Sequence, residues 1–100
     1  MPKLSVTVPH QLDQAAATER LQGILAKMKE RYAGQISDLH EEWQGNVLNY
    51  AFKTFGFNIK GAMHVEPQEV KVEGDLPFAA MMFKGKIETE LKSTLSRWLT

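Results

Sequence analysis

Histidine is the first residue type to test for metal or acid–base chemistry, and the chain has three: His10, His40 and His64. None has a second histidine four residues away, the spacing that places two ligands on one helix face. The chain has no cysteine, which excludes thiolate ligands, thiolate nucleophiles and disulfides. We therefore expect no metal site. His10 is expected to brace the start of a helix, and the other two to lie on polar strand faces.

Three carboxylates lie close together in the sequence, at Asp38, Glu41 and Glu42. Acid–base catalysis by paired carboxylates requires surroundings that separate their pKa values. Glu41 and Glu42 are adjacent in a stretch with strand alternation, so their side chains should point to opposite faces. The chain also lacks a serine in a nucleophile elbow and a glycine-rich phosphate loop. We expect no catalytic residue, no cofactor and no enzymatic activity.

Apolar side chains are in excess at two places in the second half of the chain. Two phenylalanines flank Gly56 at a predicted hairpin tip, and a run of five apolar residues follows Pro77 too closely for one helix stripe to bury. Most aromatic residues in a chain of this size build the core. Exposed aromatic residues beside adaptable methionines would instead suit an apolar partner. The candidate apolar interaction surface is Phe55, Phe57, Phe78, Met81, Met82 and Phe83.

The composition is that of an ordinary soluble domain, with 43% hydrophobic and 24% charged residues among 100, and we expect one domain over residues 1–100. Twelve basic and twelve acidic residues cancel, so no strong field would attract nucleic acid. The first ten residues do not resemble a signal peptide. The longest uncharged apolar run, Leu76–Phe83, is far shorter than the roughly 20 residues of a membrane-spanning helix. These features predict a cytoplasmic protein without a membrane span.

The first third of the chain predicts a strand and then a helix. Apolar and polar residues alternate over Lys3–Val8, as in a strand with one buried face. Asp13 is placed to cap a helix that continues to about Ala33 and has one apolar stripe. Gly34 is expected to end that helix in a left-handed conformation.

From residue 36 onward the period changes to two, and four short strands are separated by turn signals. The first, around Leu39–Gln44, is polar enough to lie at or near a sheet edge. A final helix should begin between Phe78 and Met82. Lys84, Glu88 and Lys92 are spaced at i, i+4 and i+8, which predicts a ladder of exposed ion pairs on that helix.

The predicted order is therefore β-α-β-β-β-β-α, an α+β fold. Short connections between consecutive strands favour an antiparallel sheet of four to five strands. Its apolar face must be covered, and the two amphipathic helices are the available cover, so both should pack on one face. The arrangement is similar to a reduced helix-grip fold, a likeness that implies no function.

Several short stretches, in order along almost the whole chain, resemble the family of polyhydroxyalkanoic acid system proteins of bacteria. The matching residues are Pro9-His10, Leu12, Ala16, Arg20-Leu21, Trp43, Leu48, Phe52, Gly56, Gly61, residues 72–77 and residues 83–88. The resemblance implies a cytoplasmic protein connected with the storage or handling of polyhydroxyalkanoate. It implies no catalytic residue.

Three functional hypotheses arise from the residues and the resemblance. The leading one is a non-enzymatic accessory protein that associates with polyhydroxyalkanoate granules, or with granule proteins, through exposed apolar residues. The alternative is a small carrier that encloses a hydroxyacyl or fatty chain in an apolar cavity between the sheet and the final helix. The third is a dimerisation module that uses an edge strand or the apolar surface, making a homodimer possible.

Overall fold

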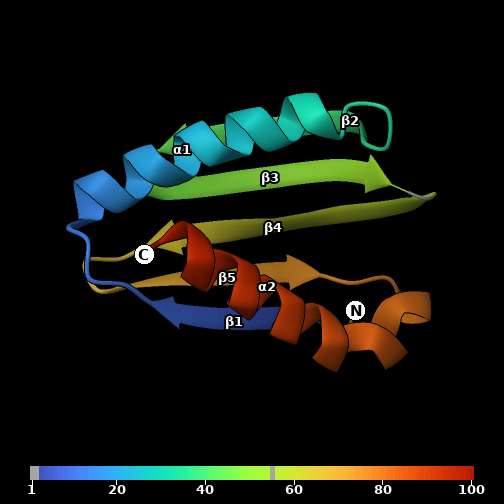
Figure 1. The fold of residues 1–100 in the computed structure, drawn as a ribbon. Helices are drawn as coiled ribbons and strands as arrows, with labels where there is room; N and C mark the ends of the chain where they lie inside the picture. The colour runs from blue at the N-terminus through green and yellow to red at the C-terminus, as the bar shows by residue number, and fades with distance from the viewer. Residues whose placement is uncertain (1–2, 55) are drawn as a thin grey trace.

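The computed structural model describes residues 3–54 and 56–100 and has the α+β element order that the sequence predicts (Figure 1). The strands are β1 (Lys3–Pro9), β2 (Ser37–Gln44), β3 (Val47–Thr54), β4 (Phe57–Val65) and β5 (Glu69–Asp75). The helices are α1 (Gln14–Arg31), the 3-10 helix η1 (Phe78–Phe83) and α2 (Lys84–Trp98). Strand boundaries follow the change from period-two alternation to turn residues.

The five strands form one antiparallel sheet in the order β1-β5-β4-β3-β2. Strands β2 to β5 are a meander of consecutive hairpins, and β1 joins the far side of β5. The register brings Val6 opposite Val72, Val72 opposite Met63 and Met63 opposite Leu48. This row of apolar residues crosses four strands on one face and is the base of the core.

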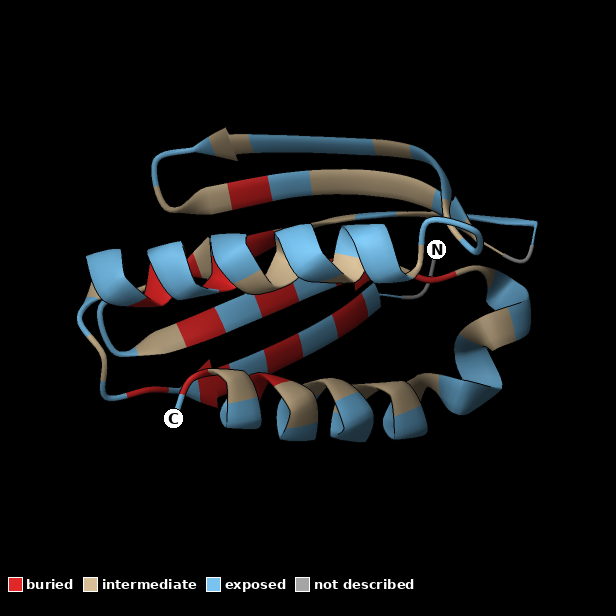
Figure 2. Cartoon of the chain, turned by 45° about the horizontal axis from the view of Figure 1, so that its top comes forward, coloured by how far each residue is buried: buried red, intermediate tan, exposed pale blue. Residues whose placement is uncertain are grey.

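Both helices cover the same face of the sheet, called here the helix side, and the other face is the open side (Figures 1 and 2). Figure 2 shows buried residues alternating with exposed ones along the strands that the helices cover. The core is thus a two-layer packing of sheet and helices, as the alternation predicts. Its buried hydrophobic residues are Leu4, Val6, Val8, Ala17, Leu21, Leu48, Met63, Val65, Val70, Val72, Leu76, Leu95 and Leu99.

The cap of α1 is at the predicted residue, but its end differs from the prediction. The Asp13 carboxylate accepts the amide of Ala16 at 2.7 Å, as expected of an N-cap. The helix ends at Arg31, and Gly34 does not adopt a left-handed conformation. The chain instead leaves α1 through a turn in which Gln35 N donates to the Tyr32 carbonyl at 2.9 Å. The prediction for Gly34 was wrong because this turn satisfies the last carbonyls without a positive φ.

The two edges of the sheet are β1 and β2, which confirms the predicted edge position of the polar strand β2. On β1, the outward amide of Ser5 donates to Glu88 Oε2 of α2 at 3.2 Å. On β2, the register shifts between Ser37 and His40, and Asp38 has a positive φ of 53°. A bulge and acidic side chains on an edge oppose pairing with another strand.

Candidate functional site

The helix η1 is a cluster of apolar side chains that the fold does not bury. Pro77 enters it with extended backbone, and Ala80 N donates to the Pro77 carbonyl at 2.9 Å to close the first tight turn. A 3-10 helix has three residues per turn, so six consecutive apolar residues point in all directions around its axis. None of the six residues is buried, and Phe78 and Met82 are 77% and 82% exposed. We call the exposed side chains of Phe78, Met81, Met82 and Phe83 the η1 tip.

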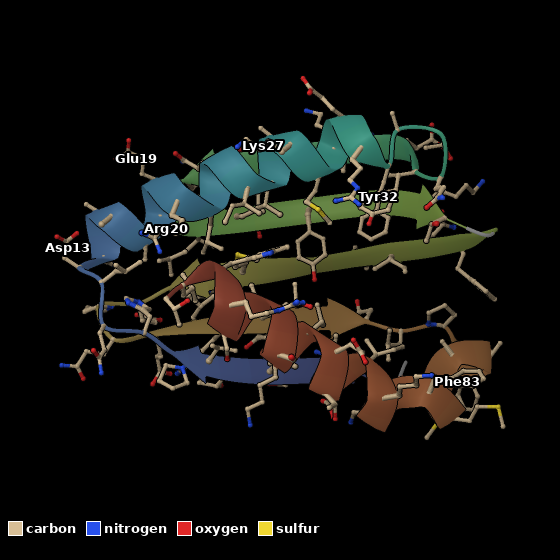
Figure 3. The ribbon with its side chains drawn as sticks, viewed as in Figure 1. Asp13, Glu19, Arg20, Lys27, Tyr32 and Phe83 are labelled. Carbon is tan, nitrogen blue, oxygen red and sulfur yellow. The ribbon has the colours of Figure 1, made fainter. Side chains whose placement is uncertain are left out.

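The η1 tip extends from one end of the sheet, the end where β1 and β4 begin and β3 and β5 end, called here the η1 end (Figure 1). Figure 3 places Phe83 at the end of the molecule opposite to Asp13, the residue that caps α1. Among the helices and strands of residues 3–54 and 56–100, the main chain of η1 comes close only to that of α2. Buried Leu76 holds the segment that enters it. The tip is therefore anchored on both sides but unpacked itself.

The predicted apolar surface is divided between two places. Phe57 begins β4 at the tip of the β3–β4 hairpin, is 39% exposed and lies at the η1 end. Phe55 was predicted beside it but lies outside the described residues. In the part of the chain that the structure describes, the main chains of β4 and η1 do not approach each other closely, so Phe57 and the η1 tip lie on separate segments.

The lysines that come after η1 do not form the predicted ion-pair ladder. Glu88 was expected between Lys84 and Lys92, but its carboxylate accepts the backbone amide of Ser5. In the described chain, the ion pairs join Lys29 to Glu41 and Lys71 to Glu69. The prediction was wrong because a fixed amide on the β1 edge is a better partner for Glu88 than a flexible exposed lysine. Within that part of the chain, Lys84 and Lys86 are therefore cations without an ion-pair partner beside the η1 tip.

The three histidines do not form one site: His10 is buried, and the other two lie on the open side of the sheet. His10 is buried, and its Nε2 must be the donor to the Glu66 carbonyl, 2.9 Å away, because a carbonyl only accepts. His10 thus braces the β4–β5 turn in addition to the segment before α1. His40 and His64 lie on the open side of β2 and β4. Among residues 3–54 and 56–100, no group of three or more histidine or carboxylate side chains could hold a metal ion.

The three neighbouring carboxylates do not act as a cluster. Glu41 accepts from Lys29 Nζ of α1 at 2.8 Å, whereas Glu42 accepts from Gln44 Nε2 at 3.0 Å, further along its own strand. Glu41 thus faces the helix side, and Glu42 faces the open side, as the alternation predicts. Asp38 lies at the bulge and is exposed.

The open side contains a groove of about 790 Å³ across the middle of the sheet. Its floor includes the small side chains of Ala51 and Ala62, and an adjoining hollow of about 360 Å³ shares Ala51 with it. The charged residues that line the groove are Lys3, Glu41, Glu42, Lys60, Glu73 and Asp75. Charges of both signs suit a polar surface contact and do not suit a fatty chain. The two hollows thus lie away from the sheet–helix space where the carrier hypothesis places its apolar cavity.

A tyrosine and two glycines on the helix side form a tight contact that sequence reasoning missed. Tyr50, Gly61 and Gly74 are opposite one another on β3, β4 and β5. The Tyr50 hydroxyl donates to the Glu73 carbonyl at 3.0 Å, which requires the ring to pass over Gly61. Burial raises the pKa of Tyr50 above 10.0, and the nearby Asp75 carboxylate raises it further. The sequence does show a glycine in each of two predicted strands, Gly61 and Gly74. Only the strand register, however, shows that the two glycines lie opposite each other and beside Tyr50.

Comparison with known proteins places residues 4–99 within one family. They match the family model described as "putative polyhydroxyalkanoic acid system protein". No curated protein and no solved structure matches the chain. The likeness to helix-grip folds thus remains an analogy. None of the described helices is both long and apolar enough to cross a membrane.

Proposed function

Because the chain belongs to the polyhydroxyalkanoic acid system protein family, we propose that it is a non-enzymatic accessory protein that attaches to polyhydroxyalkanoate granules or to their proteins. The attachment surface is the η1 tip. The observation that supports this choice is the exposure of four large apolar side chains in one six-residue segment. Scattered single apolar residues are normal on a protein surface, whereas a contiguous exposed set is typical of an interaction site.

Two properties of the η1 tip favour a broad apolar surface as its partner. The two methionines have flexible, polarizable side chains that adapt to an irregular contact. The two phenylalanines supply large apolar area and no polar group that would need a specific partner. A protruding segment also reaches a surface more easily than a recessed one, and η1 extends beyond the ends of β1 and β5 (Figure 1). Phe57, at the same end, is placed to add to the contact.

The non-enzymatic role is part of the same proposal. Candidate acid–base groups have structural partners: Glu41 pairs with Lys29, and buried His10 donates to a main-chain carbonyl. His40 and Glu42 lie on the open side, on the strand with the shifted register. We propose that these groups serve folding and surface solvation and take no part in the attachment.

The test is the location of a tagged copy in granule-bearing cells. We expect the wild-type protein to sediment with isolated granules, and the variant Phe78→Ser/Met82→Ser to stay in the supernatant. The matched control is Gln22→Ser/Ala26→Ser, which introduces two serines at exposed positions of α1. A wild-type protein that is diffuse in cells and absent from the granule fraction would refute the proposal. So would equal sedimentation of the wild type and the η1 variant.

A further inference from the structure

We infer that the η1 tip and the two lysines after it bind an anionic lipid layer, with the apolar side chains in the layer and the lysines at its charged surface. This inference rests on the proposed function, because it takes η1 as the attachment surface and specifies the chemistry of the partner. The partner is a layer of lipids with anionic headgroups over an apolar interior, and not bare polyester or a granule protein.

The position of η1 in the chain leaves its apolar side chains free to enter such a layer. It is held by buried Leu76 before it and by α2 after it, and its main chain approaches no other described helix or strand. Met82 and Phe78 are more than three-quarters exposed, so they can enter an apolar layer without any rearrangement of the core. Large apolar side chains that insert at a lipid interface, with lysines beside them at the polar surface, are the usual arrangement of proteins that lie on such a layer.

The start of α2, directly after η1, supplies the positive charge. Lys84 and Lys86 occupy the first turn of α2, and that turn has no acidic residue. Lysines at this position are unfavourable to the helix, because the N-terminus already carries partial positive charge. Glu88, the nearest acidic residue in α2, is engaged by the amide of Ser5. The two lysines thus have no acidic partner within the described chain, and they complement an anionic surface.

Other lysines towards the η1 end support the same orientation. Further lysines lie towards the η1 end, on β1, β3 and β4: Lys3, Lys53 and Lys60. Asp38 and Asp75 offset part of this charge at the same end, but Lys84 and Lys86 add to it. Figure 3 shows two acidic residues, Asp13 and Glu19, and one basic residue, Arg20, far from Phe83. Lysines without an ion-pair partner in the described chain would favour an approach to an anionic layer with the η1 tip first.

The test uses lipid vesicles and protein-free polyester particles with the full chain. Binding is measured by sedimentation with the vesicles. We expect the affinity for vesicles of phosphatidylcholine and phosphatidylglycerol to be at least about tenfold higher than for vesicles of phosphatidylcholine alone. Lys84→Gln/Lys86→Gln should weaken anionic binding about 25-fold, since one lysine near such a surface contributes about fivefold. The control Lys71→Gln/Lys92→Gln, away from η1, should bind as the wild type does. Phe78→Ser/Met82→Ser should abolish binding to both vesicles.

Each contrary result has a separate meaning. Equal binding to the two vesicle types, or unchanged binding of the Lys84/Lys86 variant, would overturn the inference. Binding to polyester particles or native granules without binding to vesicles would overturn it as well and leave the proposed function intact. Absence of binding to vesicles, particles and granules would overturn both. Thermal melting of each variant, followed by circular dichroism, shows that a loss of binding is not a loss of fold.

Discussion

The Tyr50 hydroxyl on β3 donates to the main-chain carbonyl of Glu73 on β5, 3.0 Å away, across the intervening strand β4. The bond is possible because the residue of β4 under the ring is Gly61, which is opposite Gly74 of β5. A Cβ added at Gly61 would lie 2.0 Å from the Glu73 carbonyl oxygen and 2.6 Å from the Tyr50 hydroxyl. Close backbone approach thus makes glycine necessary at this position.

The substitution Gly61→Ala should therefore destabilise the protein strongly. The nearest obstacle is backbone of the neighbouring strand, which cannot move without disturbing the ladder. We expect a loss of about 3 kcal/mol or more in the free energy of unfolding, at the upper end of overpacking effects. Urea unfolding measures it. Gly23→Ala is the control, since nothing lies within 4 Å of the added Cβ and the helix gains about 0.5–1 kcal/mol. Equal effects at the two sites would contradict the register of β4 and β5.

Removing the Tyr50 hydroxyl should cost about 1 kcal/mol, the net value of one neutral hydrogen bond. Tyr50→Phe keeps the ring and its stacking on Phe52, whose centroid is 6.2 Å away. The loss should therefore be smaller than that from Tyr50→Ala, which also removes a partly buried ring from the edge of the core. Urea unfolding of both variants at neutral pH gives the comparison. Equal losses would show that the ring packing contributes nothing.

Alkaline pH provides an independent test of the same group. Burial, and then Asp75, raise the pKa of Tyr50 in the folded state above 10.0, so the neutral phenol is favoured by folding. Its contribution is fully present below pH 10.0 and is lost as pH rises through the folded pKa. The wild type should thus lose more stability than Tyr50→Phe across this range. Tyrosinate absorbance of the Tyr32→Phe variant isolates the titration of Tyr50, and a midpoint at or below 10.0 would contradict the shift.

The contact between Glu88 and the Ser5 amide predicts local protection of the β1 edge. Glu88→Ala should lower the free energy of unfolding by no more than about 1–2 kcal/mol, because the bond is exposed but charge-assisted. Hydrogen exchange at the Ser5 amide should accelerate, while exchange at Val6, which lies within the β1–β5 pairing, should change little. Glu88→Gln retains an acceptor oxygen and should show an intermediate rate. Unchanged exchange at Ser5 in Glu88→Ala would show that the amide is protected by something else.

Patterns within a single element predicted much of this fold from the sequence. Alternation over β1 indicated its buried face, and the spacing around Asp13 indicated the cap of α1. Such patterns could not predict contacts between elements that are far apart in the sequence. Helical spacing favoured Lys84 and Lys92 as partners of Glu88, but the actual donor is Ser5, 83 residues away. The role of Gly61 likewise depends on Gly74 lying opposite it on the adjacent strand β5.

The candidate site was predictable for the opposite reason, because it consists of residues that the core does not use. The apolar stripe Ile87–Leu91–Leu95 of α2 packs against the core. The apolar residues Phe78–Phe83 come before this stripe and are additional to it, so the core does not bury them. That excess is visible in the sequence. The separation of Phe57 from the η1 tip was not, since it depends on how far the β3–β4 hairpin lies from η1 in space.

The exposure of Met82 and the burial of Leu95 predict opposite stability effects for equivalent truncations. Leu95 is 2% exposed at the interface of α2 with the core, so Leu95→Ala should cost about 2–5 kcal/mol. Met82 is 82% exposed, so Met82→Ala should change the free energy of unfolding by no more than about 0.5 kcal/mol. Urea unfolding at several protein concentrations gives both values. A large, concentration-dependent loss for Met82→Ala would mean that a second copy covers the η1 tip in solution, which would favour the homodimer over attachment to granules.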